Sequence, residues 1–186
     1  MRRICVFCGA RSGDGDTYLE IARCVARAIV ARNCGIVYGG GRVGSMGALA
    51  DAALEAGGEV VGVIPDSLAA AEIAHQGITQ LYLVDSMHAR KAMMTRLSDA
   101  FVALPGGIGT MDELFEALTW RQLGIHDKPV GILNATGYYD SLIALLDHMV
   151  QQGLLPAATR DSIAIDPAID ALLDKLFLPI SKGAHV

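Results

Sequence analysis

The amino-acid sequence predicts an α/β fold in which a doubly wound, mainly parallel sheet lies between two layers of helices. Short apolar runs alternate with longer amphipathic stretches along the whole chain, as in repeated strand and helix units. The runs VVGVI (60–64) and AFVAL (100–104) are apolar almost throughout, which suits strands covered by helices on both faces. These patterns predict a three-layer, Rossmann-like sandwich. We expect residues 1–180 to form a single domain and residues 181–186 to form a flexible tail.

Seven short apolar runs predict the strands, and the last of these runs is the weakest. The strands are expected at residues 4–7, 36–38, 60–64, 81–84, 100–104, 130–133 and 162–165. Their length of three to five residues is that of a strand and is too short for a buried helix. Nothing resembling a linker, a repeat or a low-complexity segment separates them, so the runs should belong to one sheet.

Amphipathic stretches between these runs predict six helices. They are expected at residues 17–31, 45–56, 86–97, 110–123, 138–152 and 167–177. Thr17 and Glu20 have the spacing of a capping box at the start of the first helix, and Asn33 suits its end. Asp166 is expected to cap the last helix, with Pro167 at the first helical position.

Charge and hydropathy restrict the class of partner. The 186 residues carry a formal net charge of -5, and the 15 Lys and Arg residues are scattered, which argues against nucleic acid as the main partner. The apolar run at the N-terminus breaks at Gly9, before signal-peptide length, and no segment approaches the roughly 18 apolar residues of a membrane span. The sequence therefore predicts a cytoplasmic protein without a membrane partner.

Cysteine and histidine spacing gives no sign of a metal site. Cys5 and Cys8 have the spacing of a CxxC motif, but strand alternation points residues three apart to opposite faces, so the two thiols are not expected to act as a pair. The five histidines have no ligand spacing. We therefore expect buried free thiols, no metal and no cofactor.

Two glycine-rich loops carry the first chemical signal. YGGGRVGSMG (38–47) follows the second predicted strand and LPGGIGT (104–110) follows the fifth, and each leads into a helix. Ligands of open α/β sheets bind beyond the carboxyl ends of the strands, where backbone N–H groups and a helix N-terminus favour phosphate. Tight turns without a ligand are the alternative for either loop alone. Two such loops in one small domain favour a nucleotide or sugar-phosphate ligand.

Arg90 and Lys91 add positive charge near the start of a predicted helix. A cation in the first turn of a helix opposes the helix dipole, so both side chains suit an anionic partner better than they suit helix stability. A solvated basic patch is the alternative.

Glu113 has two interpretations. If Thr110 is the N-cap, the two residues form a capping box, worth about 1 kcal/mol. A carboxylate at this position also lies beside the glycine loop, within reach of anything that the loop binds. Cap and catalyst therefore both remain open on these residues.

Three motifs in combination carry a family resemblance. YGGGxxGxMG (38–47), MHxRK (87–91) and PGGxGTxxE (105–113) resemble the Lonely Guy family of cytokinin riboside 5'-monophosphate phosphoribohydrolases. The similarity continues through residues 118–142 and covers nearly all of the chain. It departs at Ser45, where an apolar residue is common, and at Asp112, where glutamate is frequent. The resemblance implies a Rossmann-like fold, a homodimer, and hydrolysis of the N-glycosidic bond of N6-substituted adenosine 5'-monophosphates or of AMP.

The resemblance also implies roles for individual residues. Arg90 and Glu113 are the implied catalytic pair. The residues implied in substrate binding are Glu72, Lys91, Gly106, Gly107, Gly109, Thr110 and Thr119. Gly40 and Gly41 of the first glycine loop are expected to bind substrate as well.

The expected mechanism assigns a carboxylate to Glu113. Breaking a glycosidic bond builds positive charge on the sugar, which a carboxylate stabilises while it orients or deprotonates the attacking water. The nearby helix N-terminus is expected to keep Glu113 ionised. Arg90 would either hold this carboxylate or bind the phosphate. Two alternatives remain: a nucleotide-binding protein without catalysis, and a lysine decarboxylase-like enzyme using pyridoxal phosphate on Lys91.

Overall fold

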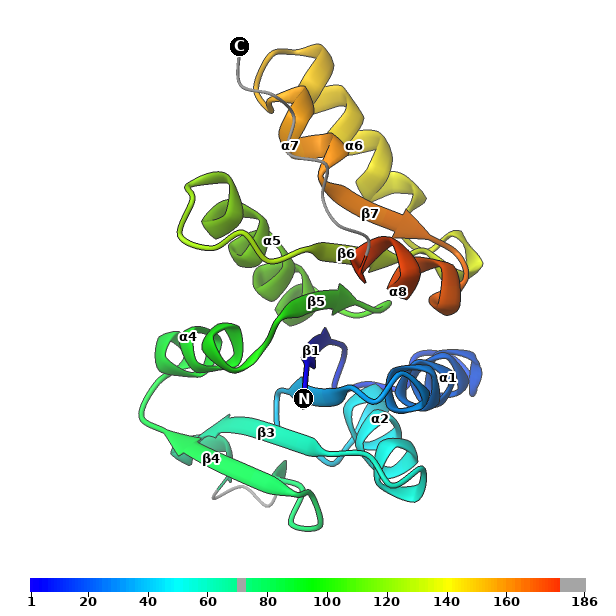
Figure 1. The fold of residues 1–186 in the computed structure, drawn as a ribbon, viewed down its shortest axis with the longest axis vertical. Helices are drawn as coiled ribbons and strands as arrows, with labels where there is room; N and C mark the ends of the chain where they lie inside the picture. Colours follow the sequence, from blue (N-terminus) through cyan, green and yellow to red (C-terminus); the bar gives the residue numbers. More distant parts are fainter. Residues whose placement is uncertain (70–72, 178–186) are drawn as a thin grey trace.

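The computed structural model describes residues 1–69 and 73–177, which contain one seven-stranded sheet whose strand pairings are all parallel (Figure 1). The strands, in sequence order, are β1 (Arg3–Phe7), β2 (Gly35–Tyr38), β3 (Val60–Pro65), β4 (Gln80–Val84), β5 (Ala100–Ala103), β6 (Val130–Leu133) and β7 (Ile163–Asp166). Their order across the sheet is β4-β3-β2-β1-β5-β6-β7. The predicted α/β class and parallel sheet are confirmed.

The helices connect these strands. They are α1 (Thr17–Ala31), α2 (Gly44–Glu55), α3 (Asp66–Leu68), α4 (Met87–Leu97), α5 (Ile108–Gln122), the 3-10 helix η2 (Ala135–Gly137), α6 (Asp140–Gln151), α7 (Ala157–Asp161) and α8 (Ile169–Phe177). The short helices α3, η2 and α7 were not expected from the sequence, because three to five residues are too few to show helical periodicity. Within the described part of the chain, no helix is both long and apolar enough for a membrane span.

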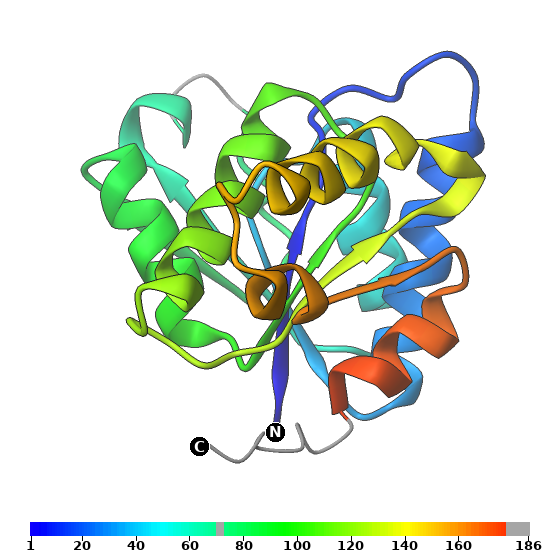
Figure 2. The same cartoon turned by 90° about the horizontal axis from the view of Figure 1, so that it is seen from above.

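The sheet has an apolar layer on each face. On one face Ile4 and Val6 pack with α1, α2 and α8, and on the other Cys5 and Phe7 pack with α4, α5 and α6. Figures 1 and 2 show these two helix layers on opposite sides of the strands. Alternate residues of one strand therefore supply two cores, which explains why the strands read as continuous apolar runs.

Helix ends follow the sequence less closely. Thr17 is the first residue of α1 and Asp16 its N-cap, with no side-chain cap, so the predicted capping box is wrong. Asn33 does adopt the expected left-handed conformation, with φ 56°, after the helix. The last helix begins at Ile169, two residues after the predicted Pro167, although the Asp166 carboxylate accepts a hydrogen bond from the Ala168 N–H.

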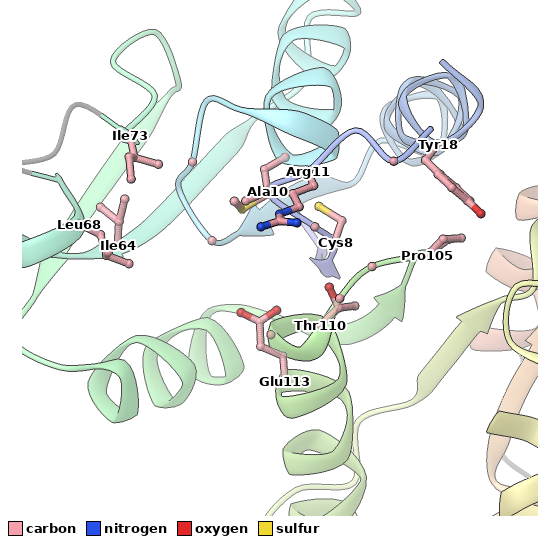
Figure 3. A pocket seen from close by; sticks show the side chains of 18 of the residues that line it. Cys8, Ala10, Arg11, Tyr18, Ile64, Leu68, Ile73, Pro105, Thr110 and Glu113 are labelled. Atoms are coloured by element: carbon pink, nitrogen blue, oxygen red, sulfur yellow. The ribbon is translucent and has the colours of Figure 1, made fainter. Parts of the chain in front are cut away.

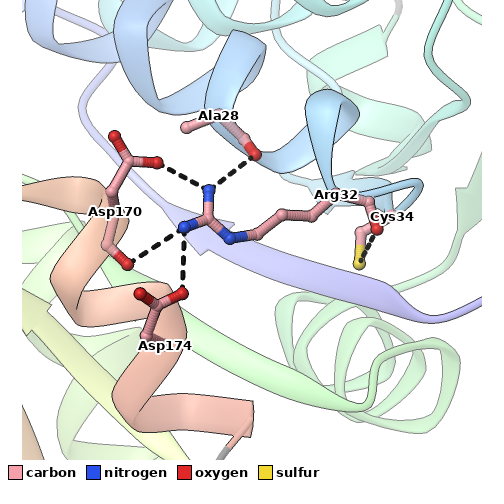
Figure 4. A network of polar contacts seen from close by, with 5 residues as sticks. All are labelled: Ala28, Arg32, Cys34, Asp170 and Asp174. Atoms are coloured by element: carbon pink, nitrogen blue, oxygen red, sulfur yellow. Dashed lines mark hydrogen bonds and ion pairs between the residues drawn. The ribbon is translucent and has the colours of Figure 1, made fainter.

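Polar contacts at the C-terminal end of α1 hold α8 in place. The Arg32 guanidinium donates to Asp170 Oδ1 at 2.6 Å, to the Asp170 carbonyl at 3.2 Å and to Asp174 Oδ1 at 3.0 Å (Figure 4). It also donates to the Ala28 carbonyl of its own helix. One arginine thus joins the first and last helices of the described chain.

The strand order reverses between β1 and β5. Strands β2, β3 and β4 continue to one side of β1, whereas β5, β6 and β7 extend to the other. The loops after β1 and β5 lead into α1 and α5, which lie on opposite faces of the sheet. A crevice opens at such a switch point, and ligands of this fold class bind there.

Candidate active site

A cavity of about 600 Å³ lies at the carboxyl edge of the sheet, over the switch point. Its walls come from the segments that follow β1, β2, β3 and β5, from the first turn of α4 and from the first two turns of α5. Figure 3 shows Glu113 and Thr110 on α5, Arg11 and Cys8 on the β1 side, and Ile64, Leu68 and Ile73 at the far end. Both glycine-rich loops singled out in the sequence contribute to this lining.

Glu113 faces the cavity and does not cap its helix. Helix α5 begins at Ile108 with Gly107 as N-cap, so Thr110 is already the third helical residue and cannot form a capping box with Glu113. The Glu113 side chain is 8% exposed, and its Oε1 lies 3.3 Å from Nη2 of Arg90. The capping interpretation is therefore wrong for this glutamate.

Arg90 reaches Glu113 from the opposite helix. Ser86 caps α4 by accepting a hydrogen bond from the Ala89 N–H, and Arg90 follows in the first turn. Its Nε donates to the Val63 carbonyl at 3.1 Å, and its Nη2 lies 3.5 Å from the Gly39 carbonyl. Three separate acceptors thus fix the guanidinium, a geometry that needs its planar fork.

Gly39 makes room for this guanidinium. A Cβ at Gly39 would lie 1.9 Å from Nη2 of Arg90, far inside van der Waals contact. Gly39, in the glycine run after β2, therefore leaves the space that the Arg90 side chain occupies. The next residue, Gly40, has φ 75° and packs against Ile64 and Val63 below the cavity wall.

Burial changes the charge expected on Glu113. Loss of solvent raises the pKa of Glu113 to about 7, and Arg90 opposes this rise only in part. The sequence predicted a carboxylate kept ionised by the helix N-terminus, and the structure corrects this prediction. The helix N-terminus is not the dominant influence, because the carboxyl lies in the second turn and is enclosed by packed side chains. A carboxyl with this pKa can exchange a proton near neutral pH.

The N-terminus of α5 provides an anion cradle at the same cavity. The first N–H groups of a helix have no intrahelical acceptor, and here they follow Gly106 and Gly107. The Thr110 hydroxyl is buried and has no hydrogen-bond partner. A Cβ built on Gly107 or Gly109 would meet no atom within 4 Å apart from the adjoining residues and the helix's own backbone, so the space beside them is open for a ligand.

The opposite end of the cavity is apolar. Met46 of α2, Ile64 of β3, Leu68 of α3 and Ile73 line it, and Gly41 completes the wall. The cavity therefore has an anion-binding end at α5, an acidic group near the middle and an apolar end. This sequence of environments fits a molecule with a phosphate, a polar centre and a flat or aliphatic group.

The β1–α1 loop, the start of α1 and the segment after η2 contribute residues that the sequence interpretation missed. Arg11 and Tyr18 line the cavity, and so does Tyr138, which lies far away in the sequence. The Tyr138 hydroxyl donates to the Gly106 carbonyl at 2.7 Å, and its ring meets Tyr18 edge-on with centroids 5.7 Å apart. The glycines in CGARSGDG (8–15) were the available signal, but their importance depends on β1 lying at the switch point.

Comparison with known proteins agrees with these motifs. A family model described as "Possible lysine decarboxylase" matches residues 46–176. The cytokinin riboside 5'-monophosphate phosphoribohydrolase of Arabidopsis thaliana is 49% identical over 175 residues, which cover 94% of this chain and 82% of the plant protein. The enzyme of the same name from Rhodococcoides fascians is 46% identical over 179 residues, covering 96% and 90%. The chain belongs to this phosphoribohydrolase family.

Solved structures extend the likeness of the fold beyond the phosphoribohydrolase family. The molybdenum cofactor carrier protein of Chlamydomonas reinhardtii superposes with a TM-score of 0.70 at 22% identity, covering 96% of this chain and 99% of that one. The molybdenum cofactor binding protein of Rippkaea orientalis gives 0.68 at 20% identity, covering 94% of each chain. At these identities the likeness concerns the fold alone. In the described residues, no group of three or more His, Cys, Asp or Glu side chains is placed to hold a metal ion.

Some residues implied by the phosphoribohydrolase resemblance do not line the cavity. Lys91 points away from it and pairs with Asp112 and Glu116. Thr119 lies on the exposed side of α5, and Gly40 lies behind the wall. Glu72 falls outside the described residues. The residues that the structure does bring to the cavity are Arg90, Glu113, Gly106, Gly107, Gly109, Thr110 and Gly41.

Proposed function

We propose that this protein hydrolyses the N-glycosidic bond of cytokinin riboside 5'-monophosphates, and of AMP, to a free base and ribose 5-phosphate. The arrangement of Glu113 and Arg90 between an anion cradle and an apolar pocket carries the proposal. The names of relatives at 46–49% identity support the reaction and the substrate class.

The proposed mechanism uses one water and the Glu113 carboxylate. The C1'–N9 bond breaks with its electron pair moving to the purine, and the water oxygen forms a new bond to C1'. Glu113 stabilises the positive charge that develops on the sugar and accepts the proton released by the water. The departing purine takes up a proton from solvent. The pKa of about 7 suits Glu113 to this exchange near neutral pH.

The reaction is tested by incubating the purified protein with AMP and separating the products by chromatography. Free adenine and ribose 5-phosphate in equal amounts are expected. Tight binding of AMP without release of base would instead indicate a nucleotide-binding protein. A parallel assay with an N6-prenylated AMP measures the contribution of Met46, Ile64, Leu68 and Ile73, which should favour the aliphatic substituent.

A decarboxylase using pyridoxal phosphate is less well supported. Such an enzyme needs a lysine that can form a Schiff base with the cofactor. The lining residues of the cavity include no lysine among the described residues, and Lys91 is held by two carboxylates outside it.

Thr110→Val tests the proposed phosphate site. The valine has the shape of threonine without the hydroxyl, and we expect the KM for AMP to rise about tenfold with a smaller change in kcat. Thermal stability should be unchanged or increased, because the buried hydroxyl has no partner in the free protein. A KM equal to that of the wild type would place the phosphate elsewhere.

We also infer a homodimer formed through the exposed side of α5. Ile108 is 87% exposed and Phe115 36% exposed on this side, and Met87 on α4 is 43% exposed. Ile108 and Phe115 are seven residues apart and so lie on one face of α5, and apolar side chains gathered on one face favour a protein interface. Thr119 would then lie at the subunit contact. Met94, also on α4, is 1% exposed and belongs to the core, so it is not part of this surface.

Light scattering tests the homodimer. The wild type should have twice the mass of the chain, and Phe115→Glu should shift the protein toward monomer. Leu154→Glu is a matched control, because Leu154 is also exposed (81%) but lies after α6. A monomeric wild type at micromolar concentration would contradict the proposal.

The predicted cytoplasmic location remains a prediction.

A further inference from the structure

A cluster of three charged side chains lies beside the catalytic candidates and outside the cavity. Lys91 Nζ is 2.7 Å from Glu116 Oε2 and 3.0 Å from Asp112 Oδ2. The Lys91 side chain is only 10% exposed, and that of Glu116 is 22% exposed. We call Lys91, Asp112 and Glu116 the charge cluster.

The cluster connects the same two helices that carry the catalytic candidates. Lys91 follows Arg90 on α4, while Asp112 precedes and Glu116 follows Glu113 on α5. One ion pair, between Arg90 and Glu113, faces the cavity, and a second, through Lys91, lies next to it and faces away. Because consecutive helical residues point about 100° apart, the two pairs can brace the helix contact from neighbouring directions.

We propose that Lys91, Asp112 and Glu116, through their ion pairs between α4 and α5, position Arg90 and Glu113 across the cavity and place one cation and two anions beside the Glu113 carboxylate. Lys91 is then a positioning residue and not a substrate ligand. The effect of the cluster on catalysis rests on the proposed hydrolase function, whereas its effect on the charge of Glu113 is a property of the ligand-free protein.

The groups around Glu113 have opposing effects on its pKa. Burial raises it most, Arg90 and Lys91 lower it, and Asp112 and Glu116 raise it. From β1, the thiols of Cys5 and Cys8 also approach Glu113, but burial raises their own pKa values far above neutral, so they stay uncharged. Arg11 lines the same cavity from the β1–α1 loop.

Activity should fall at low pH as Glu113 becomes protonated, and we call this part of the pH profile its acidic limb. Removing the cation of the cluster and removing one of its anions should move this limb in opposite directions. Lys91→Met removes a cation and leaves two carboxylates, so the pKa of Glu113 should rise and activity should appear at higher pH. Asp112→Asn removes an anion and should shift the limb to lower pH. Relative to each variant's own plateau, we expect activity at pH 6 to fall about threefold for Lys91→Met and to increase for Asp112→Asn. A loss of structure alone would not produce opposite shifts.

The experiment compares kcat/KM for AMP between pH 5 and pH 9 in the wild type, both single variants and the double variant. The substrate phosphate titrates in every profile alike, so differences between variants report the protein. Asp112 is 54% exposed, so its asparagine variant should fold normally. Lys91→Arg keeps the cation, so its kcat/KM should decline at the same acidic pH as that of the wild type. In the double variant, the pH of this decline should lie closer to the wild-type value than it does in Lys91→Met. Lys175→Met is the matched control, because Lys175 pairs with Asp166 far from the cavity.

A second measurement separates this inference from the proposed function. The side-chain carboxyl carbon of Glu113, assigned with Glu113→Gln, is titrated by NMR in the ligand-free protein. The titration midpoint of Glu113 should move up in Lys91→Met and down in Asp112→Asn, and this result supports the inference even if the protein does not hydrolyse AMP. Absence of AMP hydrolysis would overturn only the proposed function. Midpoints that stay unchanged, or that move in the same direction in both variants, overturn the inference.

Discussion

Glu113→Gln is expected to abolish release of adenine from AMP, lowering kcat by about a thousandfold or more. Glutamine keeps the size of the side chain and can still accept a hydrogen bond from Arg90, but it cannot take the proton of water. It also carries no charge to stabilise the cationic sugar in the transition state. Loss of both contributions gives the expected magnitude. Base release over several hours, followed by chromatography, measures it.

The same substitution should stabilise the fold above neutral pH. The pKa of Glu113 rises from an ordinary 4.5 to about 7 in the folded protein, so the folded state holds this proton more tightly than the unfolded chain. The resulting stability is present below about pH 4.5 and is lost as the pH rises to 7. This corresponds to about 3 kcal/mol. Glutamine resembles the protonated carboxyl, so the variant should be more stable than the wild type at pH 8.

Glu59→Gln is the matched control for this experiment. Glu59 also pairs with an arginine, because Arg3 donates to both of its carboxylate oxygens at 2.7 and 2.8 Å, but it lies just before β3 and outside the cavity. The Glu59→Gln variant should therefore release adenine from AMP at nearly the wild-type rate. An active Glu113→Gln variant, within tenfold of the wild type, would remove Glu113 from the mechanism and leave the anion cradle as a binding site only.

The fold could be predicted closely because its signals are local. Each strand is a short apolar run, and all seven expected runs became strands to within one or two residues. Helix starts were less accurate, since a capping box needs a hydrogen bond that the spacing of Thr17 and Glu20 does not guarantee. Five residues of α7 carry no recognisable period at all.

The site was harder to predict because its properties depend on packing. The motifs indicated Arg90 and Glu113, but the pKa of Glu113 depends on burial between α4, α5 and β1, which the sequence does not display. Lys91 was expected at the substrate from its place in the first turn of a helix and from the family resemblance, yet one helical step after Arg90 its side chain pairs with Asp112. Arg11 was missed because only the sheet order brings its loop to the cavity.

Arg90→Lys is expected to lower kcat by about a hundredfold or more. The guanidinium meets the Val63 carbonyl, the Gly39 carbonyl and Glu113 from two different nitrogens, and a single ammonium cannot satisfy all three. The positive charge survives, but the fixed position of the Glu113 carboxylate does not. Arg3→Lys, which weakens the pair with Glu59 outside the cavity, should leave activity intact.

Steady-state kinetics of Arg90→Lys distinguish the two roles open to this arginine. If Arg90 orients Glu113, kcat falls and the KM for AMP changes little, because the substrate still binds. If Arg90 binds the 5'-phosphate, KM rises steeply and the slow hydrolysis of adenosine is unaffected. The contacts favour orientation, because the guanidinium is already engaged by two backbone carbonyls and one carboxylate, and the anion cradle lies at the start of α5. Activity within threefold of the wild type would reduce Arg90 to a source of positive charge, which lysine supplies equally well.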